Sequence, residues 1–296
     1  MIDGIVAVNK PVGVTSHDVV QIIRKKTNQK RIGHTGTLDP FASGVLLLLL
    51  GSTTRLARYF SHDTKQYEAD IFFGAKTETG DHTGRVIEAA NLGKKEIANF
   101  LSKTDWSNIT GKFKGDILQR PPKYSAKKIG GRRSYQLARE GKDIELEPIN
   151  VKINALEIVR IEENKVTIEV ECSAGTYIRT LAEDIGKAVG LPAHLTRLER
   201  TRVGIFSISD AVSLDAEREE LLSKMCSPAA ALANMAKYCI ADSRTKATLN
   251  GLSTRVVGQE FTEGQEVMIL SSENVLLAIG IYDRVKNELK PKIVLK

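Results

Sequence analysis

The stretch RIGHTGTLDPFASGVLLLLLG, residues 31–51, decides the fold. Within it, the six residues from Val45 to Leu50 are all aliphatic, and they are bounded by Gly44 and Gly51. A run of this length is too short to span a membrane and is typical of a strand that is buried on both faces of a sheet. We therefore predict a rigid central strand at this place.

The residues before this strand should form a loop. Glycines and a proline interrupt regular structure within residues 33–40, so we expect residues 34–43 to be held as a loop against the sheet, with His34 and Asp39 on it. Loops on a rigid scaffold often carry catalytic groups. Taken alone, however, an Asp before Pro40 is more often a plain Asx-turn.

Composition places the chain among soluble globular proteins with a nucleic-acid partner. With 296 residues, 42% hydrophobic and 27% charged, it can form one large and one small domain. The formal net charge of +7 favours a polyanionic partner. The segment from Lys112 to Lys142 contains ten Lys or Arg residues and only two acidic residues. This local positive charge is suited to binding a phosphate backbone. Charge alone is equally consistent with a solvated basic loop.

The cysteines and the N-terminus indicate a cytoplasmic protein. Cys172, Cys226 and Cys239 are far apart and have no histidine at ligand spacing, so the sequence supports neither a zinc site nor a disulfide framework. The chain begins without a signal peptide, and no run approaches the roughly eighteen apolar residues of a membrane span.

Hydrophobic periodicity and turn residues predict the other elements. Strands are expected at residues 2–8, 65–73, 151–161 and 166–172. Helices are expected after a capping box at Thr15 and Asp18, over residues 53–60, after residues 175–179 up to Gly190, and over residues 214–225. Residues 78–84, ETGDHTG, should form a polar surface loop.

The C-terminal tail should form a separate small domain. Short β-like runs at residues 267–270 and 275–281 alternate with glycines and polar turns, which suits a small β-barrel. We expect a domain boundary near residue 235, giving domains 1–235 and 236–296.

Five ordered blocks within residues 2–210 resemble the TruB family of tRNA pseudouridine synthases. They are DGIVAVNKPVGVTSHDVV from residue 3, GHTGTLDPFASGVL from residue 33, KQYEA from residue 65, QRPPKYSAKK from residue 119 with YQLAREG from residue 135, and GTYIR from residue 175 with HLTRLERTRVGIF from residue 194.

This resemblance implies an α+β fold with a mixed, largely antiparallel sheet core and flanking helices, the pseudouridine synthase fold. The tail resembles a PUA domain, an RNA-binding module. The implied reaction isomerises uridine 55 in the T loop of tRNA to pseudouridine: the C1′–N1 bond breaks, the uracil turns, and C1′ joins C5 after the base has been flipped out. The resemblance also implies a monomer that acts on the T stem-loop without cofactor, metal, guide RNA or protein partner.

The resemblance assigns roles to individual residues. The catalytic residues are Asp39, which is essential, Arg179, which pairs with it, and Tyr67, which stacks on the uracil and could help to remove the C5 proton. His34 takes part in base flipping, Lys10 supports the active-site loop, and Leu198 is the active-site leucine. The expected substrate- and RNA-binding residues are His34, Lys10, Leu198, Lys123, Tyr124, Arg132, Arg133, Arg200 and Arg202.

Other interpretations stay open at this point. The basic segment and the tail also suit a non-catalytic RNA-binding protein. A hydrolase that uses Asp39 is disfavoured because the sequence has no second carboxylate at metal spacing near it. A guide-RNA-dependent pseudouridine synthase shares the same motifs. Asp39 could attack C1′, add at C6 or remove the C2′ proton.

Overall fold

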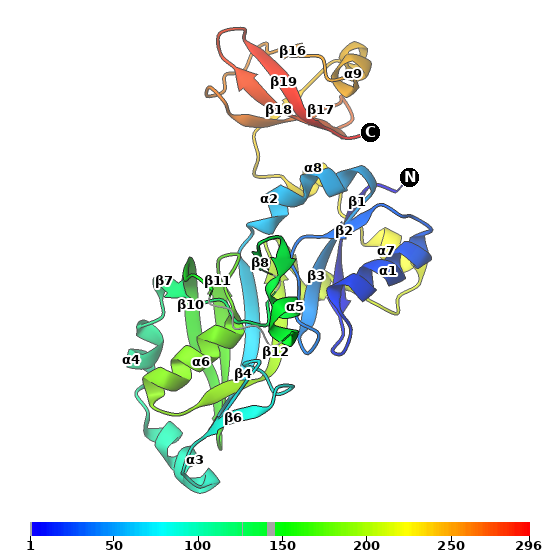
Figure 1. Ribbon diagram of the computed structural model, residues 1–296. Helices are drawn as coiled ribbons and strands as arrows, with labels where there is room; N and C mark the ends of the chain where they lie inside the picture. The colour runs from blue at the N-terminus through cyan, green and yellow to red at the C-terminus, as the bar shows by residue number, and fades with distance from the viewer. Residues whose placement is uncertain (1, 126, 141–145) are drawn as a thin grey trace.

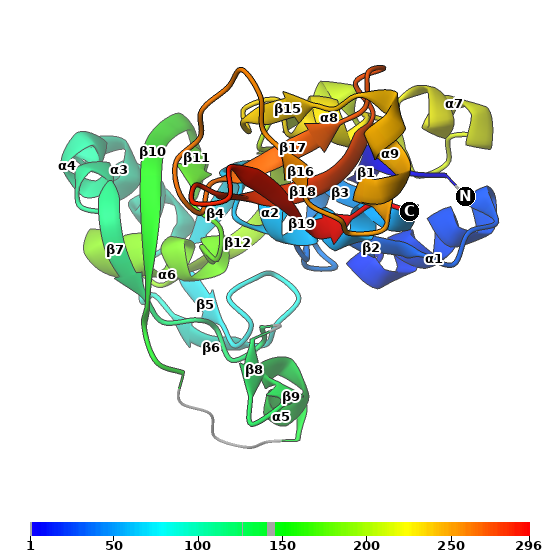
Figure 2. The same cartoon turned by 90° about the horizontal axis from the view of Figure 1, so that it is seen from above.

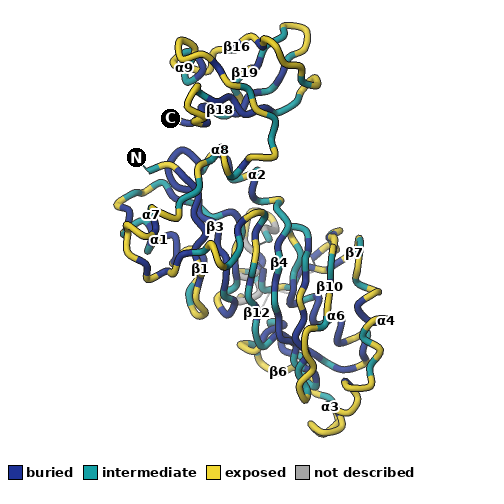
Figure 3. Tube along the Cα trace, turned by 180° about the vertical axis from the view of Figure 1, so that it is seen from behind, coloured by how far each residue is buried: buried dark blue, intermediate teal, exposed yellow. Residues whose placement is uncertain are grey.

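The computed structural model describes residues 2–125, 127–140 and 146–296. At its centre lies β3 (Ser43–Leu50), in which every residue from Gly44 onward is buried. Alternate residues of β3 belong to two different apolar clusters, Val45 with Leu47 to one and Leu46 with Leu48 to the other. Figure 3 shows this strand as continuously buried. The predicted strand with two buried faces is therefore confirmed.

Strand β3 is part of a ten-stranded sheet that is mixed and largely antiparallel, as predicted (Figure 1). The main path runs β14 (Val212–Ser213), β1 (Gly4–Lys10), β3, β12 (Ala193–Val203), β4 (Lys65–Phe73), β11 (Lys165–Cys172), β10 (Ile149–Glu162) and β7 (Gly115–Gln119). Off this path, β2 (Ile32–His34) pairs with β3 and β13 (Phe206–Ser207) pairs with β12.

The two halves of the sheet meet where β3 and β12 run parallel. Their register contains the pairs Ser43 with Glu199 and Gly44 with Arg200. Gly44 has φ of 105°, and a Cβ atom there would lie 2.3 Å from the Arg200 carbonyl oxygen. Only glycine combines this backbone conformation with so close an approach. The junction therefore depends on one residue without a side chain.

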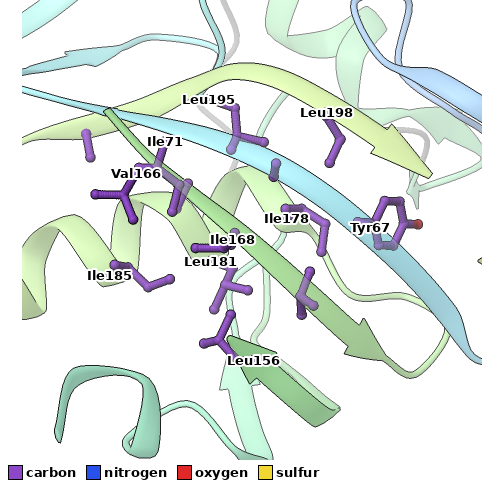
Figure 4. Packing of buried hydrophobic residues seen from close by; sticks show 14 of the residues in the cluster. Tyr67, Ile71, Leu156, Val166, Ile168, Ile178, Leu181, Ile185, Leu195 and Leu198 are labelled. Carbon is purple, nitrogen blue, oxygen red and sulfur yellow. The ribbon is translucent and has the colours of Figure 1, made fainter. Parts of the chain in front are cut away.

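Helices cover the sheet on both sides of this junction. Helix α1 (Ser16–Thr27) begins with the predicted capping box of Thr15 and Asp18, and its apolar residues pack on β3. Helix α6 (Ile178–Val189) ends at Gly190, whose φ of 89° is the expected left-handed cap. Its residues Leu181 and Ile185 pack under β4 and β11 (Figure 4).

Several short elements connect these layers. They are η1 (Gly51–Leu56), α2 (Ala57–Ser61), β5 (Ala75–Thr77), β6 (Val86–Ala89), α3 (Lys94–Lys103), α4 (Trp106–Gly111), β8 (Lys128–Ile129), β9 (Arg132–Arg133), α5 (Ser134–Arg139), η2 (Ile208–Asp210), α7 (Arg218–Ser223) and α8 (Pro228–Ala231). Seen from above, β8, β9 and α5 project from the sheet beside β5 and β6 (Figure 2). Within the described residues, no helix is long and apolar enough to cross a membrane.

The tail forms a second, five-stranded sheet (Figure 1). Its order is β15 (Lys237–Cys239), β17 (Glu266–Leu270), β18 (Leu276–Asp283), β19 (Glu288–Val294) and β16 (Thr254–Arg255), with α9 (Asp242–Leu249) beside it. Met268 and Leu295 share an apolar cluster with Leu47 of the main sheet. Arg58 of α2 also pairs with Glu266. The tail is thus packed against the large sheet.

One predicted helix is wrong in its extent. Residues 214–225 were expected to be helical throughout, but α7 covers only Arg218–Ser223. Leu214 and Ala216 are buried in the cluster on one face of β3 before the helix begins. Tertiary burial of these two side chains outweighs the helical periodicity of the segment.

We expect Gly44→Ala to destabilise the fold by at least about 2 kcal/mol, because the new methyl group would strike the Arg200 backbone in a conformation that is strained for alanine. The measurement is the urea midpoint of unfolding. Gly111→Ala is the matched control, since a Cβ atom at the end of α4 meets no atom within 4 Å. Equal midpoints for the two variants would contradict the requirement for glycine at the junction.

Candidate active site

The loop before β3 is held in place by the N-terminal segment. The Ser16 hydroxyl accepts a hydrogen bond from the Leu38 N–H at 2.9 Å and donates to the Leu38 carbonyl at 3.2 Å. The Gly13 N–H donates to the Pro40 carbonyl at 2.8 Å. Asp39 lies between these two anchored residues. The predicted loop is therefore present, although His34 itself ends β2.

The structure brings Arg179 to Asp39. The Arg179 Nε atom lies 2.9 Å from Asp39 Oδ2, and the two side chains are 6% and 35% exposed. The other guanidinium nitrogens donate to backbone carbonyls, Nη1 to Thr79 at 2.7 Å and Nη2 to Tyr124 at 2.8 Å. Arg179 is thus fixed by three segments of the chain, and Asp39 keeps an exposed edge.

Asp81 is a site residue that sequence reasoning missed. Its Oδ2 atom lies 3.8 Å from Arg179 Nη1, and the residue is 4% exposed. Its Oδ1 atom accepts hydrogen bonds from the Thr83 N–H and the Thr79 hydroxyl, each at 2.9 Å. The prediction that residues 78–84 form only a surface loop is therefore wrong for Asp81. No spacing in the sequence reveals a contact between segments so far apart.

Asp81 is a second carboxylate beside the Asp39–Arg179 pair, which the sequence did not indicate. A guanidinium pairs with both carboxylates. Among the residues that the structure describes, no group of three or more His, Cys, Asp or Glu side chains is arranged to hold a metal ion.

Burial decides the direction of the Asp39 pKa. Removal from water raises the pKa of Asp39 above its ordinary value of 3.8. The positive charges of Arg179 and Lys10 lower this pKa, while the negative charge of Asp81 raises it, and the net shift is upward. Arg179 thus reduces the effect of burial without cancelling it. A carboxylate with a raised pKa is a stronger base and nucleophile once it is ionised.

Asp39 and Arg179 line a pocket of about 300 Å³ together with Tyr67, Leu198 and Arg200. Tyr67 on β4 and Leu198 on β12 are buried at the end of the apolar cluster above α6 (Figure 4). Burial raises the pKa of Tyr67, and the charge of Arg200 opposes this rise. Tyr67 is therefore a neutral phenol at pH 7.

Tyr177 also lines this pocket, on the side of Arg179. Burial raises the pKa of Tyr177. The sequence block GTYIR already contained this aromatic residue two positions before the arginine, so its position was a usable signal.

Two of the basic residues expected to bind RNA, Lys10 and Arg200, are buried. Lys10 is fully buried, and its amine donates to the carbonyls of Pro11 and Val14 at 2.8 and 2.9 Å. Burial lowers the pKa of Lys10 to about 8. Arg200 is 2% exposed and donates to the carbonyls of Val45 and Gly36. Lys10 therefore supports the loop from inside the protein, and Arg200 lines the pocket.

The other expected contacts lie outside the pocket core. Lys123, Arg132 and Arg202 are exposed, and Arg132 pairs with Glu140. Tyr124 is half-buried, and its hydroxyl donates to Glu78 at 3.0 Å.

The remaining predicted positions lie on β2, on β9 and outside the described residues. His34 pairs with Leu48 across β2 and β3 and precedes Thr35, which lines the pocket. Arg133 belongs to β9, but its side chain lies outside the described part of the structure. Lys142, which closes the basic segment, lies outside the described residues altogether.

Solved structures share this fold over the whole chain. One is an H/ACA RNP bound to a substrate RNA containing 2′-deoxyuridine, with a TM-score of 0.71 and 25% identity, covering 99% of this chain and 85% of that chain. Another is a Cbf5-Nop10-Gar1 complex, with a TM-score of 0.68 and 26% identity, covering 99% of this chain and 83% of that chain.

The fold and the site together define a pseudouridine synthase. The model of the TruB family pseudouridylate synthase N-terminal domain matches residues 24–178, and that of the tRNA pseudouridylate synthase B C-terminal domain matches residues 179–232. The chain belongs to the TruB family of pseudouridylate synthases.

Curated relatives support the same assignment. A tRNA pseudouridine synthase B of Heliobacterium modesticaldum is 38% identical over 94% of this chain and 90% of its own length. A protein of the same name from Caldicellulosiruptor saccharolyticus is 45% identical over 72% of this chain and 71% of its own length.

We expect opposite shifts in the pKa of Asp39 from two variants. Lys10→Met removes a nearby positive charge and should raise this pKa, whereas Asp81→Asn removes a negative charge and should lower it. The measurement is the 13C shift of the Asp39 carboxyl group against pH. Lys152→Met, an exposed position on β10, should leave the titration unchanged. Shifts of the same sign in both variants would refute this electrostatic description of the site.

Proposed function

We propose that this chain converts uridine 55 in the T loop of tRNA to pseudouridine. The observation that carries the proposal is the Asp39–Arg179 pair at a pocket lined by Tyr67, in a chain of the TruB family. The curated relatives are named tRNA pseudouridine synthase B, which supports tRNA as the substrate. The position within tRNA comes from the resemblance of the five sequence blocks.

In this proposal Asp39 is the catalytic residue. The isomerisation breaks the C1′–N1 bond, turns the uracil, forms the C1′–C5 bond, and moves one proton from C5 while N1 gains one, so no atom is lost or added. An ionised carboxylate can attack C1′, add at C6 or take the C2′ proton. All three routes require an oxygen that is exposed to the substrate. The partly exposed Asp39 carboxylate, held by Arg179, meets this requirement.

Tyr67 acts in this proposal as a stacking partner for the flipped uracil. A base held against an aromatic ring gains about 1–3 kcal/mol. The raised pKa of Tyr67 keeps its hydroxyl protonated at neutral pH, which favours stacking over direct removal of the C5 proton. Leu198 supplies an apolar neighbour on the adjacent strand.

Base flipping and RNA binding use the surface around the pocket. His34 lies next to the pocket-lining Thr35, and we propose that it takes the place of the flipped base within the RNA. The exposed side chains of Lys123, Arg132 and Arg202 are suited to phosphate contacts, which gain from counterion release.

The remaining expectations become part of the proposal. We propose domains 1–235 for catalysis and 236–296 as a PUA-like RNA-binding domain, in a cytoplasmic monomer that needs no cofactor, metal or protein partner. The free thiols of Cys172, Cys226 and Cys239 fit a reducing compartment.

A guide-dependent synthase is the second candidate, because the similar solved structures are an H/ACA RNP and a Cbf5-Nop10-Gar1 complex. The higher identity to relatives named tRNA pseudouridine synthase B favours independence from a guide. Incubation of the chain with an unmodified tRNA transcript, without metal or guide RNA, followed by carbodiimide-primer extension, separates the two. A single stop in the T loop supports a stand-alone enzyme. Tight binding without a stop would favour the guide-dependent candidate or a non-catalytic RNA-binding protein.

We expect Asp39→Asn to abolish pseudouridine formation, by at least about 1,000-fold, while tRNA affinity stays within about threefold, because the amide keeps the shape of the side chain and loses its anionic oxygen. Single-turnover rates and filter binding measure the two quantities. A rate near that of the wild type would defeat the assignment of Asp39.

We expect Lys123→Gln to weaken tRNA binding uniformly and to reduce the slope of log affinity against log salt by roughly 1, as the loss of one phosphate contact requires. Lys152→Gln on the exposed side of β10 is the control. An unchanged slope for Lys123→Gln would remove this residue from the RNA interface.

A further inference from the structure

Gln119 is a fully buried polar side chain to which the proposed reaction gives no role. It is the last residue of β7, at the edge of the large sheet, and its exposure is 0%. Its amide makes two hydrogen bonds to the backbone of one residue. Nε2 donates to the Tyr177 carbonyl at 3.2 Å, and Oε1 accepts from the Tyr177 N–H at 3.0 Å. The amide thus supplies the donor and the acceptor that a neighbouring strand would offer to the backbone of Tyr177.

Tyr177 occupies a position where such a bridge affects the active site. It is the residue before α6, it lines the pocket, and its side chain does not cap the helix. Arg179 lies two residues further along, in the first turn of α6. Tyr177 and Arg179 belong to the same helical turn, in which the backbone geometry is regular. The position of the Tyr177 backbone therefore fixes the position of the Arg179 Cα atom, from which the side chain extends to Asp39.

Further contacts follow the same two segments. The Thr180 hydroxyl donates to the Arg120 carbonyl at 3.3 Å, and Arg179 Nη2 donates to the Tyr124 carbonyl at 2.8 Å. Residues 119–124 therefore run beside residues 177–180. The Gln119 amide is a rigid planar group that makes two hydrogen bonds to Tyr177. It therefore fixes both the distance and the orientation of the Tyr177 backbone relative to β7.

We propose that Gln119 is a positioning residue of the active site: its amide holds the backbone of Tyr177 and thereby aims Arg179 at Asp39. This inference rests on the proposed function. Without the bridge, the first turn of α6 loses its lateral support, and Arg179 lowers the pKa of Asp39 less effectively. Loss of Gln119 should therefore change the chemistry at Asp39 as well as the stability of the fold.

The test compares Gln119→Met with Gln29→Met. Methionine keeps the length and apolar volume of glutamine and removes both hydrogen bonds. Gln29 is half-buried and makes a similar bridge elsewhere, because its amide accepts from the Ile2 N–H at 2.7 Å and donates to the Ile2 carbonyl at 2.8 Å, with a further bond to the Arg31 carbonyl at 3.4 Å. Gln29 is absent from the pocket lining. The measurements are thermal unfolding, kcat and KM for tRNA, the pH dependence of kcat/KM, and the 13C titration of Asp39.

For Gln119→Met we expect kcat to fall about tenfold or more with KM within about twofold, since a small displacement of a catalytic partner costs rate more than binding. The pKa of Asp39 and the acidic limb of kcat/KM should both move to higher pH. Gln29→Met should change only thermal unfolding. If Gln119→Met does not fold, Gln119→Asn keeps the neutral amide on a side chain that is one methylene shorter, and it should shift the limb in the same direction by less.

An acidic limb and a kcat equal to those of the wild type in a folded Gln119→Met protein would overturn the inference. So would a loss of activity that merely follows the unfolded fraction. If the wild-type chain forms no pseudouridine, the proposed function fails instead. The Asp39 titration then still decides whether Gln119 positions Arg179.

Discussion

The guanidinium of Arg179 joins stretches of chain that are far apart in the sequence. It pairs with Asp39 at 2.9 Å, approaches Asp81 at 3.8 Å, and donates to the carbonyls of Thr79 and Tyr124. An arginine that is removed from water must place its donors and its charge against acceptors and anions. The loops that carry Asp39 and Asp81 and the part of the basic segment around Tyr124 are therefore correctly placed only together, and the reactivity of Asp39 depends on all three.

The sheet supplies the fixed frame for this arrangement. Strand β3 is buried on both faces and meets β12 at Gly44, where no side chain fits. Lys10 and Arg200 support the frame from inside the protein. Burial lowers the pKa of both Lys10 and the pocket-lining Lys65 to about 8. Lys65 thus places a cation in the pocket lining at pH values below about 8, and Lys10 places another behind the loop.

The tail contributes packing as well as its proposed RNA surface. Its sheet shares an apolar cluster with β3, and Arg55 and Arg58, from the η1 and α2 elements that precede β4, contact it. Strand β4, which carries Tyr67, therefore follows directly after two elements that contact the tail. The exposed basic side chains of Lys123, Arg132 and Arg202 all lie in the larger part of the chain.

The sequence by itself determined the buried strand, the capped helix α1, the end of α6 at Gly190 and the family, because these follow from local periodicity, caps and long motifs. It also named Asp39, Tyr67 and Arg179. Only the tertiary structure revealed the burial of Asp81, the internal positions of Lys10 and Arg200, the shortening of α7 and the bridge from Gln119. Each of these features depends on contacts between distant segments and on which charged groups are buried away from water. A sequence pattern contains neither kind of information.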